Sequence, residues 1–211
     1  MPTLETPQGN LYYTYHVVEN SAFPPLILVH GAGGDHLIWP AELRRFPQAS
    51  VYALDLPAHG RSDGQAQNTI LGYAESVYQF WHALKLPPAV IIGHSMGGAI
   101  AQTIALNFSE MIIGLVLIGT GPYLTVNPKI LDAARNDLNA LASMITRWQW
   151  GPAASEQLRQ LGDQQLRTGN PDVVYADYVA CSTFDVSTQL SQITIPTLVV
   201  GGTADKMTPL A

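Results

Sequence analysis

The stretch from Ala89 to Phe108 restricts the fold of this chain more than any other part of the sequence. It reads AVIIGHSMGGAIAQTIALNF, which is an apolar β-branched run, a serine between glycines, and then apolar residues at helical spacing. A short apolar run is typical of a strand buried on both faces of a parallel sheet, and the spacing after it predicts a helix. We therefore expect a strand, a sharp turn and a helix, with Ser95 in the turn.

The turn predicts chemistry as well as structure. A serine forced between a strand and a helix takes strained backbone angles, and its hydroxyl stands above the sheet. Gly93 and Gly97 leave room where the strand and the helix crowd together. The helix begins with unpaired N–H groups and the positive end of its dipole, which suit a developing oxyanion. This pattern favours a nucleophilic Ser95 over a serine that only caps a helix.

Composition excludes several classes of protein. The 211 residues are enough for one sizeable core, and 47% of them are apolar while only 12% are charged. The net charge of −6, without any basic run, argues against nucleic acid as a partner. No apolar stretch approaches the roughly 18 residues of a membrane span, and residues 1–10 lack the pattern of a secretory signal. We therefore expect a cytoplasmic protein that acts on a small molecule and not on a membrane. The oligomeric state is left open.

A second glycine-rich segment follows another apolar strand. Residues 26–29 read LILV and residues 30–34 read HGAGG. Glycines at this density let backbone N–H groups approach a ligand closely. Just beyond this loop, we expect Asp35 and His36 to be exposed polar residues.

Three further predictions concern packing rather than chemistry. Aromatic and β-branched residues predict an edge strand over Leu11–Val18, and apolar spacing predicts a helix over Thr69–Leu86. The single cysteine, Cys181, excludes an intrachain disulfide and is expected to be a small apolar filler.

Together, the serine turn, the HGAGG loop and the segment DLPAHGRS at residues 55–62 resemble the α/β-hydrolase superfamily. The resemblance implies an α/β fold with a mostly parallel, doubly wound sheet and helices on both faces. It implies that Ser95 is the nucleophile, and that the backbone N–H groups of Ala32 and Met96 form an oxyanion hole. It also implies a buried structural role for His30 beneath the glycine loop.

The resemblance also divides the chain. Residues 123 to about 190 contain no run typical of a core strand, and apolar residues recur there at helical spacing. The family inserts a helical cap at this point. We therefore expect a cap over residues 122–190 and a hydrolase core made of residues 1–121 and 191–211.

Asp205 follows the apolar run at 197–201 and matches the carboxylate of the family's catalytic triad. In that role it would accept the N–H of the basic histidine, fix its tautomer and stabilise the imidazolium. The alternative is a loop aspartate that only makes a turn.

The family pattern breaks after Asp205. The family order is serine, acid, histidine, yet only six residues follow Asp205 and the last histidine of the chain is His94. The C-terminal strand and helix of the family core are missing, so we expect the strand at 197–201 to leave an exposed sheet edge. Three explanations are open. The chain is a fragment of a longer hydrolase, or it binds a ligand without turnover, or an upstream histidine such as His36 serves as the base.

The function we expect is that of a serine hydrolase that cleaves a small ester-like substrate, a carboxylester, lactone or thioester, through an acyl-enzyme. A serine at position 95 argues against haloalkane dehalogenases and epoxide hydrolases, whose nucleophile is aspartate. The alternative is a non-catalytic ligand-binding protein of the same fold, or an inactive fragment that lacks the triad histidine. The sequence carries no metal-ligand cluster and no cofactor fingerprint, so neither a metal nor a cofactor is implied.

Overall fold

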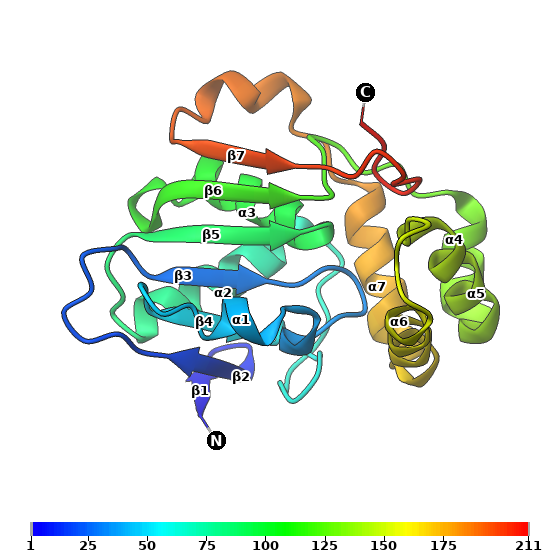
Figure 1. The fold of residues 1–211 in the computed structure, drawn as a ribbon, viewed down its shortest axis with the longest axis horizontal. Coiled ribbons are helices and arrows are strands. Elements are labelled where there is room, and N and C mark those ends of the chain that lie inside the picture. The colour runs from blue at the N-terminus through cyan, green and yellow to red at the C-terminus, as the bar shows by residue number, and fades with distance from the viewer. Residues whose placement is uncertain (1, 211) are drawn as a thin grey trace.

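The computed structural model describes residues 2–210, and their strands form one mixed sheet (Figure 1). Within these residues the sheet has seven strands in the order β1-β2-β4-β3-β5-β6-β7. The β1–β2 and β2–β4 pairs are antiparallel, and every pair from β4 through β3, β5 and β6 to β7 is parallel. The predicted α/β fold with a mostly parallel sheet is confirmed. The strands are β1 Thr3–Thr6, β2 Gly9–His16, β3 Leu26–Val29, β4 Val51–Leu54, β5 Ala89–His94, β6 Ile112–Ile118 and β7 Thr197–Val200.

The sheet is apolar on both faces because successive side chains of a strand point to opposite sides. Ile27 and Val29 of β3 pack with the larger apolar cluster, which includes α2 (Ile70–Ala83) and α3 (Met96–Asn107). Leu28, which lies between them, packs instead with Trp39 in a smaller cluster. Figure 1 shows the short helix α1 (Ala41–Arg44) in front of the sheet and α2 and α3 behind it. The helices therefore lie on both faces, as predicted.

Four helices lie between β6 and β7 in the described chain, and we call them the helical insertion. They are α4 (Pro128–Asn136), α5 (Leu138–Gln149), α6 (Glu156–Thr168) and α7 (Pro171–Ser182). Each begins after a residue whose side chain accepts a hydrogen bond from the first turn, which is why the breaks fall where they do. These N-cap residues are Asn127, Asp137, Ser155 and Asn170.

The helical insertion lies beyond the arrowheads of the parallel strands, at their carboxyl ends (Figure 1). It has an apolar cluster of its own, in which Ile130, Leu141 and Leu166 are buried. Ligands of open α/β sheets bind outside the carboxyl ends of the strands. The helical insertion is therefore next to the place where this fold positions a site.

Short 3-10 turns occur at His36–Ile38, Ser109–Met111 and Ser187–Gln192.

Two packing predictions have different outcomes. Cys181 is 4% exposed, so the prediction of a buried filler is confirmed. The strand predicted over Leu11–Val18 is present as β2, but its placement at the edge is wrong, because β1 pairs with β2 and forms the edge itself. Strand β1 has four residues, of which only Leu4 is apolar, so it shows no apolar alternation that would predict a strand. A tight turn at Gly9, whose φ is +119°, folds it back onto β2.

At the other edge of the sheet, β7 presents its side chains to solvent, as the sequence predicts. Leu198 is 57% exposed and Val199 is 63% exposed. These two residues point to opposite faces of the strand, so both faces of β7 are open among the described residues.

Candidate active site

The serine turn has the geometry that the sequence predicts. Strand β5 ends at His94, helix α3 begins at Met96, and Ser95 between them has φ +52° and ψ −117°. A residue other than glycine rarely adopts this positive φ, because the conformation is strained. Such backbone strain persists only where the surrounding structure enforces it. The Ser95 N–H donates to the Ile118 carbonyl at 2.9 Å, and the Ser95 hydroxyl caps no helix N–H. The hydroxyl is therefore left available at the start of α3.

Two glycines make this turn possible. A Cβ atom on Gly93 would collide with the carbonyl oxygen of Gly97, and a Cβ on Gly97 would collide with the carbonyl oxygen of Val29. Backbone atoms cannot move aside as a flexible side chain can. Strand β5, helix α3 and the end of β3 can therefore meet only if both positions are glycine.

The loop at residues 30–34 lies directly against the turn. A Cβ on Gly31 would come within 3.1 Å of the Ser95 Cβ, so a larger residue there would crowd the serine turn. The Gly31 carbonyl accepts hydrogen bonds from the Gly34 N–H at 3.1 Å and from His30 Nδ1 at 2.8 Å. Since N–H and C=O point in opposite directions across a trans peptide, the Ala32 N–H points away from this anchor.

His30 is neutral and fixed in one tautomer. Its Nε2 accepts a hydrogen bond from the Leu56 N–H at 3.0 Å, so the ring proton must be on Nδ1, which faces the Gly31 carbonyl. Burial holds the pKa of His30 well below its ordinary value, and the nearby His59 lowers the pKa further. The fully buried ring therefore acts as a neutral donor beneath the loop.

Asp205 lies near the carboxyl end of β6. Its Oδ1 accepts hydrogen bonds from the N–H groups of Met207 at 2.8 Å and Thr208 at 3.0 Å, and its Oδ2 accepts from the Thr208 hydroxyl at 2.8 Å. A Cβ on Gly119 would come within 3.6 Å of Asp205 Oδ2 and 3.8 Å of His94 Cδ2. Asp205 thus makes a turn of its own, and it also lies close to the residue that precedes Ser95.

His94 keeps exposed surface beside this carboxylate. The protein that surrounds the rest of its ring lowers the pKa of His94, and the charge of Asp205 opposes that shift. The structure therefore brings Ser95, the glycine loop and the Asp205 loop together at the carboxyl ends of the strands. The catalytic roles of Ser95, Asp205, Ala32 and Met96 stay predictions.

Residues 24–149 match the family model of the alpha/beta hydrolase fold. The chain belongs to the α/β-hydrolase family. This confirms the resemblance seen in the serine turn and the HGAGG loop.

Similar proteins include named esterases. The chain is 29% identical over 200 residues to a pimeloyl-[acyl-carrier protein] methyl ester esterase of Yersinia pseudotuberculosis serotype IB (strain PB1/+), covering 87% of this chain and 76% of the relative. A hydrolase from Pseudomonas aeruginosa PA01 has a TM-score of 0.88 and 25% identity, covering 99% of this chain and 82% of that one. An enol-lactonase from Burkholderia xenovorans LB400 shares the fold, with a TM-score of 0.86, 21% identity, and coverage of 96% and 81%. These relatives agree with the predicted enzyme class, a hydrolase that acts on ester bonds.

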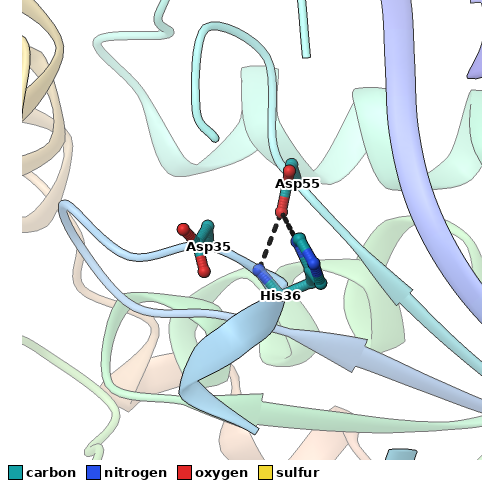
Figure 2. A group of neighbouring side chains, drawn as sticks. All are labelled: Asp35, His36 and Asp55. Carbon is teal, nitrogen blue, oxygen red and sulfur yellow. Dashed lines mark hydrogen bonds and ion pairs between the residues drawn. The ribbon is translucent and has the colours of Figure 1, made fainter. Parts of the chain in front are cut away.

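In this α/β hydrolase, the prediction that His36 is exposed is wrong. His36 is 5% exposed, and both its backbone N–H and its Nδ1 lie 2.7 Å from Asp55 Oδ1, as Figure 2 shows. The fully buried Asp55 carboxylate also accepts the Arg61 N–H at 2.9 Å. A buried carboxylate needs such donors, and this need pulls His36 inward. The His36 ring packs on Tyr12 of β2, with ring centroids 5.2 Å apart, and β4 and β3 separate β2 from β5 in the sheet. This position argues against His36 as the base for Ser95.

Asp35, His36 and Asp55 are also the residues of the described chain that offer ligand atoms close enough for a metal ion, all within 4.8 Å. Their hydrogen bonds account for the grouping. Asp35 Oδ1 accepts the Leu37 N–H at 2.7 Å, and no dashed line reaches Asp35 from the other two residues in Figure 2. We therefore interpret the three residues as a hydrogen-bonded cluster that joins the segment after the glycine loop to the end of β4.

Sequence reasoning missed one cluster near the α/β-hydrolase loop. Asp177 on α7 is fully buried, and its carboxylate contacts His59 and Tyr73 of the core. The signal was available, since Asp177 lies at helical spacing from apolar residues that are buried on the same helix. Those residues are Val173, Val174, Ala180 and Cys181. An acidic residue on the buried face of a helix indicates a cation or hydrogen-bond donors on another element that satisfy its carboxylate.

Proposed function

We propose that this α/β hydrolase cleaves a small, uncharged ester-like substrate, a carboxylester, lactone or thioester, through an acyl-enzyme on Ser95. The observation that carries the proposal is the strained Ser95 backbone, with φ +52°, held against a glycine loop. Strain of this kind at the end of a parallel strand is typical of a nucleophilic serine. The Yersinia relative is named as a methyl ester esterase, so that protein also acts on an ester bond.

The reaction has two steps. Ser95 Oγ attacks the carbonyl carbon and loses its proton to a base, and the carbonyl oxygen becomes an oxyanion. We assign its stabilisation to the N–H groups of Ala32 and Met96, where Ala32 faces away from the His30 anchor and Met96 begins α3. Collapse expels the alcohol or thiol, which takes the proton. Water then attacks the acyl-enzyme, releasing the acid and restoring Ser95.

Asp205 is the proposed carboxylate that orients the base. Support for this role comes from its position after β7 and from its closeness to His94. We assign the role of the base to none of the 211 residues; the His36 ring packs on Tyr12 of β2, which is separated from β5 by two strands.

We further propose that the helical insertion is a cap that covers the reacting atoms, with residues 122–190 as the cap and residues 1–121 and 191–211 as the core. Ala32 and Met207 pack on the apolar cluster of the insertion, which supports this division, and a cavity of about 220 Å³ lies between the insertion and the Asp205 loop. Such a wall would exclude water and limit the size of the substrate. The cavity is lined by Thr125, Asn127, Ile130, Trp148, Lys206 and Met207.

A cytoplasmic location stays a prediction of the sequence. No helix in residues 2–210 has the length and apolar character that crossing a membrane requires.

The first experiment is intact mass spectrometry after exposure to a fluorophosphonate, with Ser95→Ala as the matched control. We expect a single adduct on the wild-type protein and none on the variant. Turnover of p-nitrophenyl acetate, also lost in Ser95→Ala, would establish hydrolysis. An adduct that persists in Ser95→Ala would contradict the assignment of Ser95 as the nucleophile.

The rival function is ligand binding without turnover, in which no base activates the hydroxyl of Ser95. Added imidazole separates the two. If Ser95 only lacks its base, imidazole will raise p-nitrophenyl acetate hydrolysis above the rate of the Ser95→Ala variant at the same imidazole concentration. Equal rates in the two proteins, with no adduct, would leave the binding protein as the better reading.

A further inference from the structure

The buried carboxylate of Asp177 links the helical insertion to three separate segments of the core. Its Oδ2 accepts the Gly33 N–H at 2.8 Å and lies 2.8 Å from His59 Nε2, while its Oδ1 accepts the Tyr73 hydroxyl at 2.5 Å. Gly33 belongs to the loop after β3, His59 to the loop after β4, and Tyr73 to α2. A fully buried carboxylate is tolerated because these donors satisfy it.

The Asp177–His59 contact is an ion pair. His59 Nδ1 lies 2.9 Å from the Pro57 carbonyl oxygen, which can only accept, and His59 Nε2 faces the carboxylate. Both ring nitrogens therefore donate, as only an imidazolium can. Burial lowers the pKa of His59, but the charge and hydrogen bond of Asp177, the Pro57 carbonyl and the charge of Asp55 outweigh it and raise the pKa.

Gly33 is also where the helical insertion packs on the loop. A Cβ on Gly33 would come within 3.1 Å of Leu166 Cδ2 on α6 and 3.5 Å of Val174 Cγ2 on α7, and Gly33 has φ +64°. The loop thus has an anchor on each side of Ala32. One is the Gly31 carbonyl, held by His30 and Gly34, and the other is the Gly33 N–H, held by Asp177.

We propose that Asp177 is a positioning residue for the oxyanion loop, so that the loop directs the Ala32 N–H toward the acyl group on Ser95 only while the helical insertion is docked. The carboxylate makes no contact with the reacting atoms in this role. It acts by fixing the peptide that follows Ala32. The inference rests on the proposed function, because it assigns the Ala32 N–H to the oxyanion.

Two substitutions of similar volume separate positioning from simple stability. Asp177→Asn keeps an oxygen that can accept the Gly33 N–H but loses the charge that pairs with His59. Asp177→Leu loses both. Both variants should have a lower melting temperature than the wild type, because both break the ion pair. Only Asp177→Leu should lose loop geometry. Arg167→Gln is the control, since Arg167 bonds Asp163, Asn139 and Ser143 within the insertion, away from the loop.

The first readout is hydrogen exchange of the Gly33 amide, which needs no catalysis. We expect about tenfold faster exchange in Asp177→Leu, a small change in Asp177→Asn and none in Arg167→Gln, because losing a charge-assisted hydrogen bond has about that effect. Unchanged exchange in Asp177→Leu would overturn the proposal. If the Leu side chain prevents folding, Asp177→Ala removes the acceptor without added bulk and is judged by the same criterion.

The second readout is ester hydrolysis, with kcat and KM measured separately. We expect kcat to fall by roughly 10- to 100-fold in Asp177→Leu with KM little changed, since losing one whole oxyanion donor costs about 100- to 1,000-fold. Asp177→Asn should recover most of the kcat despite its lower melting temperature. Equal kcat in the Asn and Leu variants would refute positioning. If the wild type neither reacts with fluorophosphonate nor turns over ester, the proposed function fails, and the exchange measurement alone decides the role of Asp177.

Discussion

At the scale of single residues, the backbone of Ser95 is the most informative feature. Its φ of +52° and ψ of −117° suit glycine and are strained for any residue with a Cβ atom. The surroundings enforce the conformation, because Gly93 and Gly97 bring β5, α3 and the end of β3 into contact. Strain stored here stabilises nothing, so its persistence is best explained by the use of the hydroxyl.

The strain at Ser95 predicts which of two inactive variants is the more stable. Ser95→Gly should be more stable than Ser95→Ala by about 1 kcal/mol, because relief of roughly 1–3 kcal/mol of strain exceeds the entropy cost of glycine. Thermal or urea unfolding of the two inactive variants measures the difference. Glycine is preferred over alanine even at an ordinary N-cap, so a more stable alanine variant would contradict the strained geometry.

The two crowded glycines predict a second residue-scale effect. Gly97→Ala should lower the free energy of unfolding by about 3 kcal/mol or more, because the new Cβ collides with backbone atoms at the end of β3. Gly114→Ala is the matched control within the sheet. Its Cβ would meet only Val90 Cγ2 at 3.4 Å and Pro196 O at 3.7 Å, so we expect a change within about 1 kcal/mol. Similar losses in both variants would argue against a special packing role for Gly97.

At the scale of elements, helix α7 is docked through charge as well as through apolar contact. The ion pair of Asp177 with His59 is buried beside His30, whose ring centroid lies 4.9 Å from that of His59. The other titratable groups that act on this pair are Tyr73, Asp55, Tyr178 and Cys181. The two histidines are shifted in opposite directions, so they affect stability on opposite sides of neutrality.

The raised pKa of His59 predicts a loss of stability at alkaline pH. The stabilisation is fully present below the unfolded pKa of about 6.5 and is lost as the pH rises through the folded pKa. Urea unfolding between about pH 6.5 and pH 9 should therefore show a decline that His59→Gln lacks. The lowered pKa of His30 acts below about pH 6.5 instead, so it cannot cause this decline.

The control for that measurement is His82→Gln, since His82 is an exposed histidine on α2. We compare the slopes with pH and not the absolute stabilities, because His59→Gln leaves the Asp177 carboxylate without its ion-pair partner. A decline of equal slope in His59→Gln would show that another group titrates.

At the scale of the whole molecule, the sheet has an open edge at β7 among the described residues. Leu198, Val199 and Val200 are between 43% and 63% exposed. The outer side of an edge strand offers unpaired N–H and C=O groups to another chain, and apolar side chains increase that tendency.

The open edge predicts self-association of the chain of 211 residues. Val199→Lys should reduce it while changing the free energy of unfolding by no more than about 0.5 kcal/mol, because the side chain is 63% exposed. Light scattering at rising protein concentration measures the effect. Val17→Lys is the control, as Val17 is 51% exposed and lies outside the strands. An equal effect of the two lysines would point to net charge and not to the β7 edge.

The sequence by itself determined the features that depend on neighbours along the chain. Strand β5, the turn at Ser95 and helix α3 are adjacent in sequence, so apolar spacing and glycine positions predict them directly. The HGAGG loop and the run before Asp205 follow in the same way, from strands that end in turn residues. The mostly parallel sheet and the helices between β6 and β7 were expected from the resemblance that these segments carry.

Only the tertiary structure decided which distant residues meet. His36 was predicted to be exposed, but Asp55, 19 positions later, draws it into the core by two hydrogen bonds. Asp177 is 144 positions from Gly33, and no local pattern relates them. The reason is physical, since a buried carboxylate must find donors wherever the fold brings them. Local periodicity specifies which face of a helix is buried, whereas the partner of a charge on that face depends on how whole elements pack.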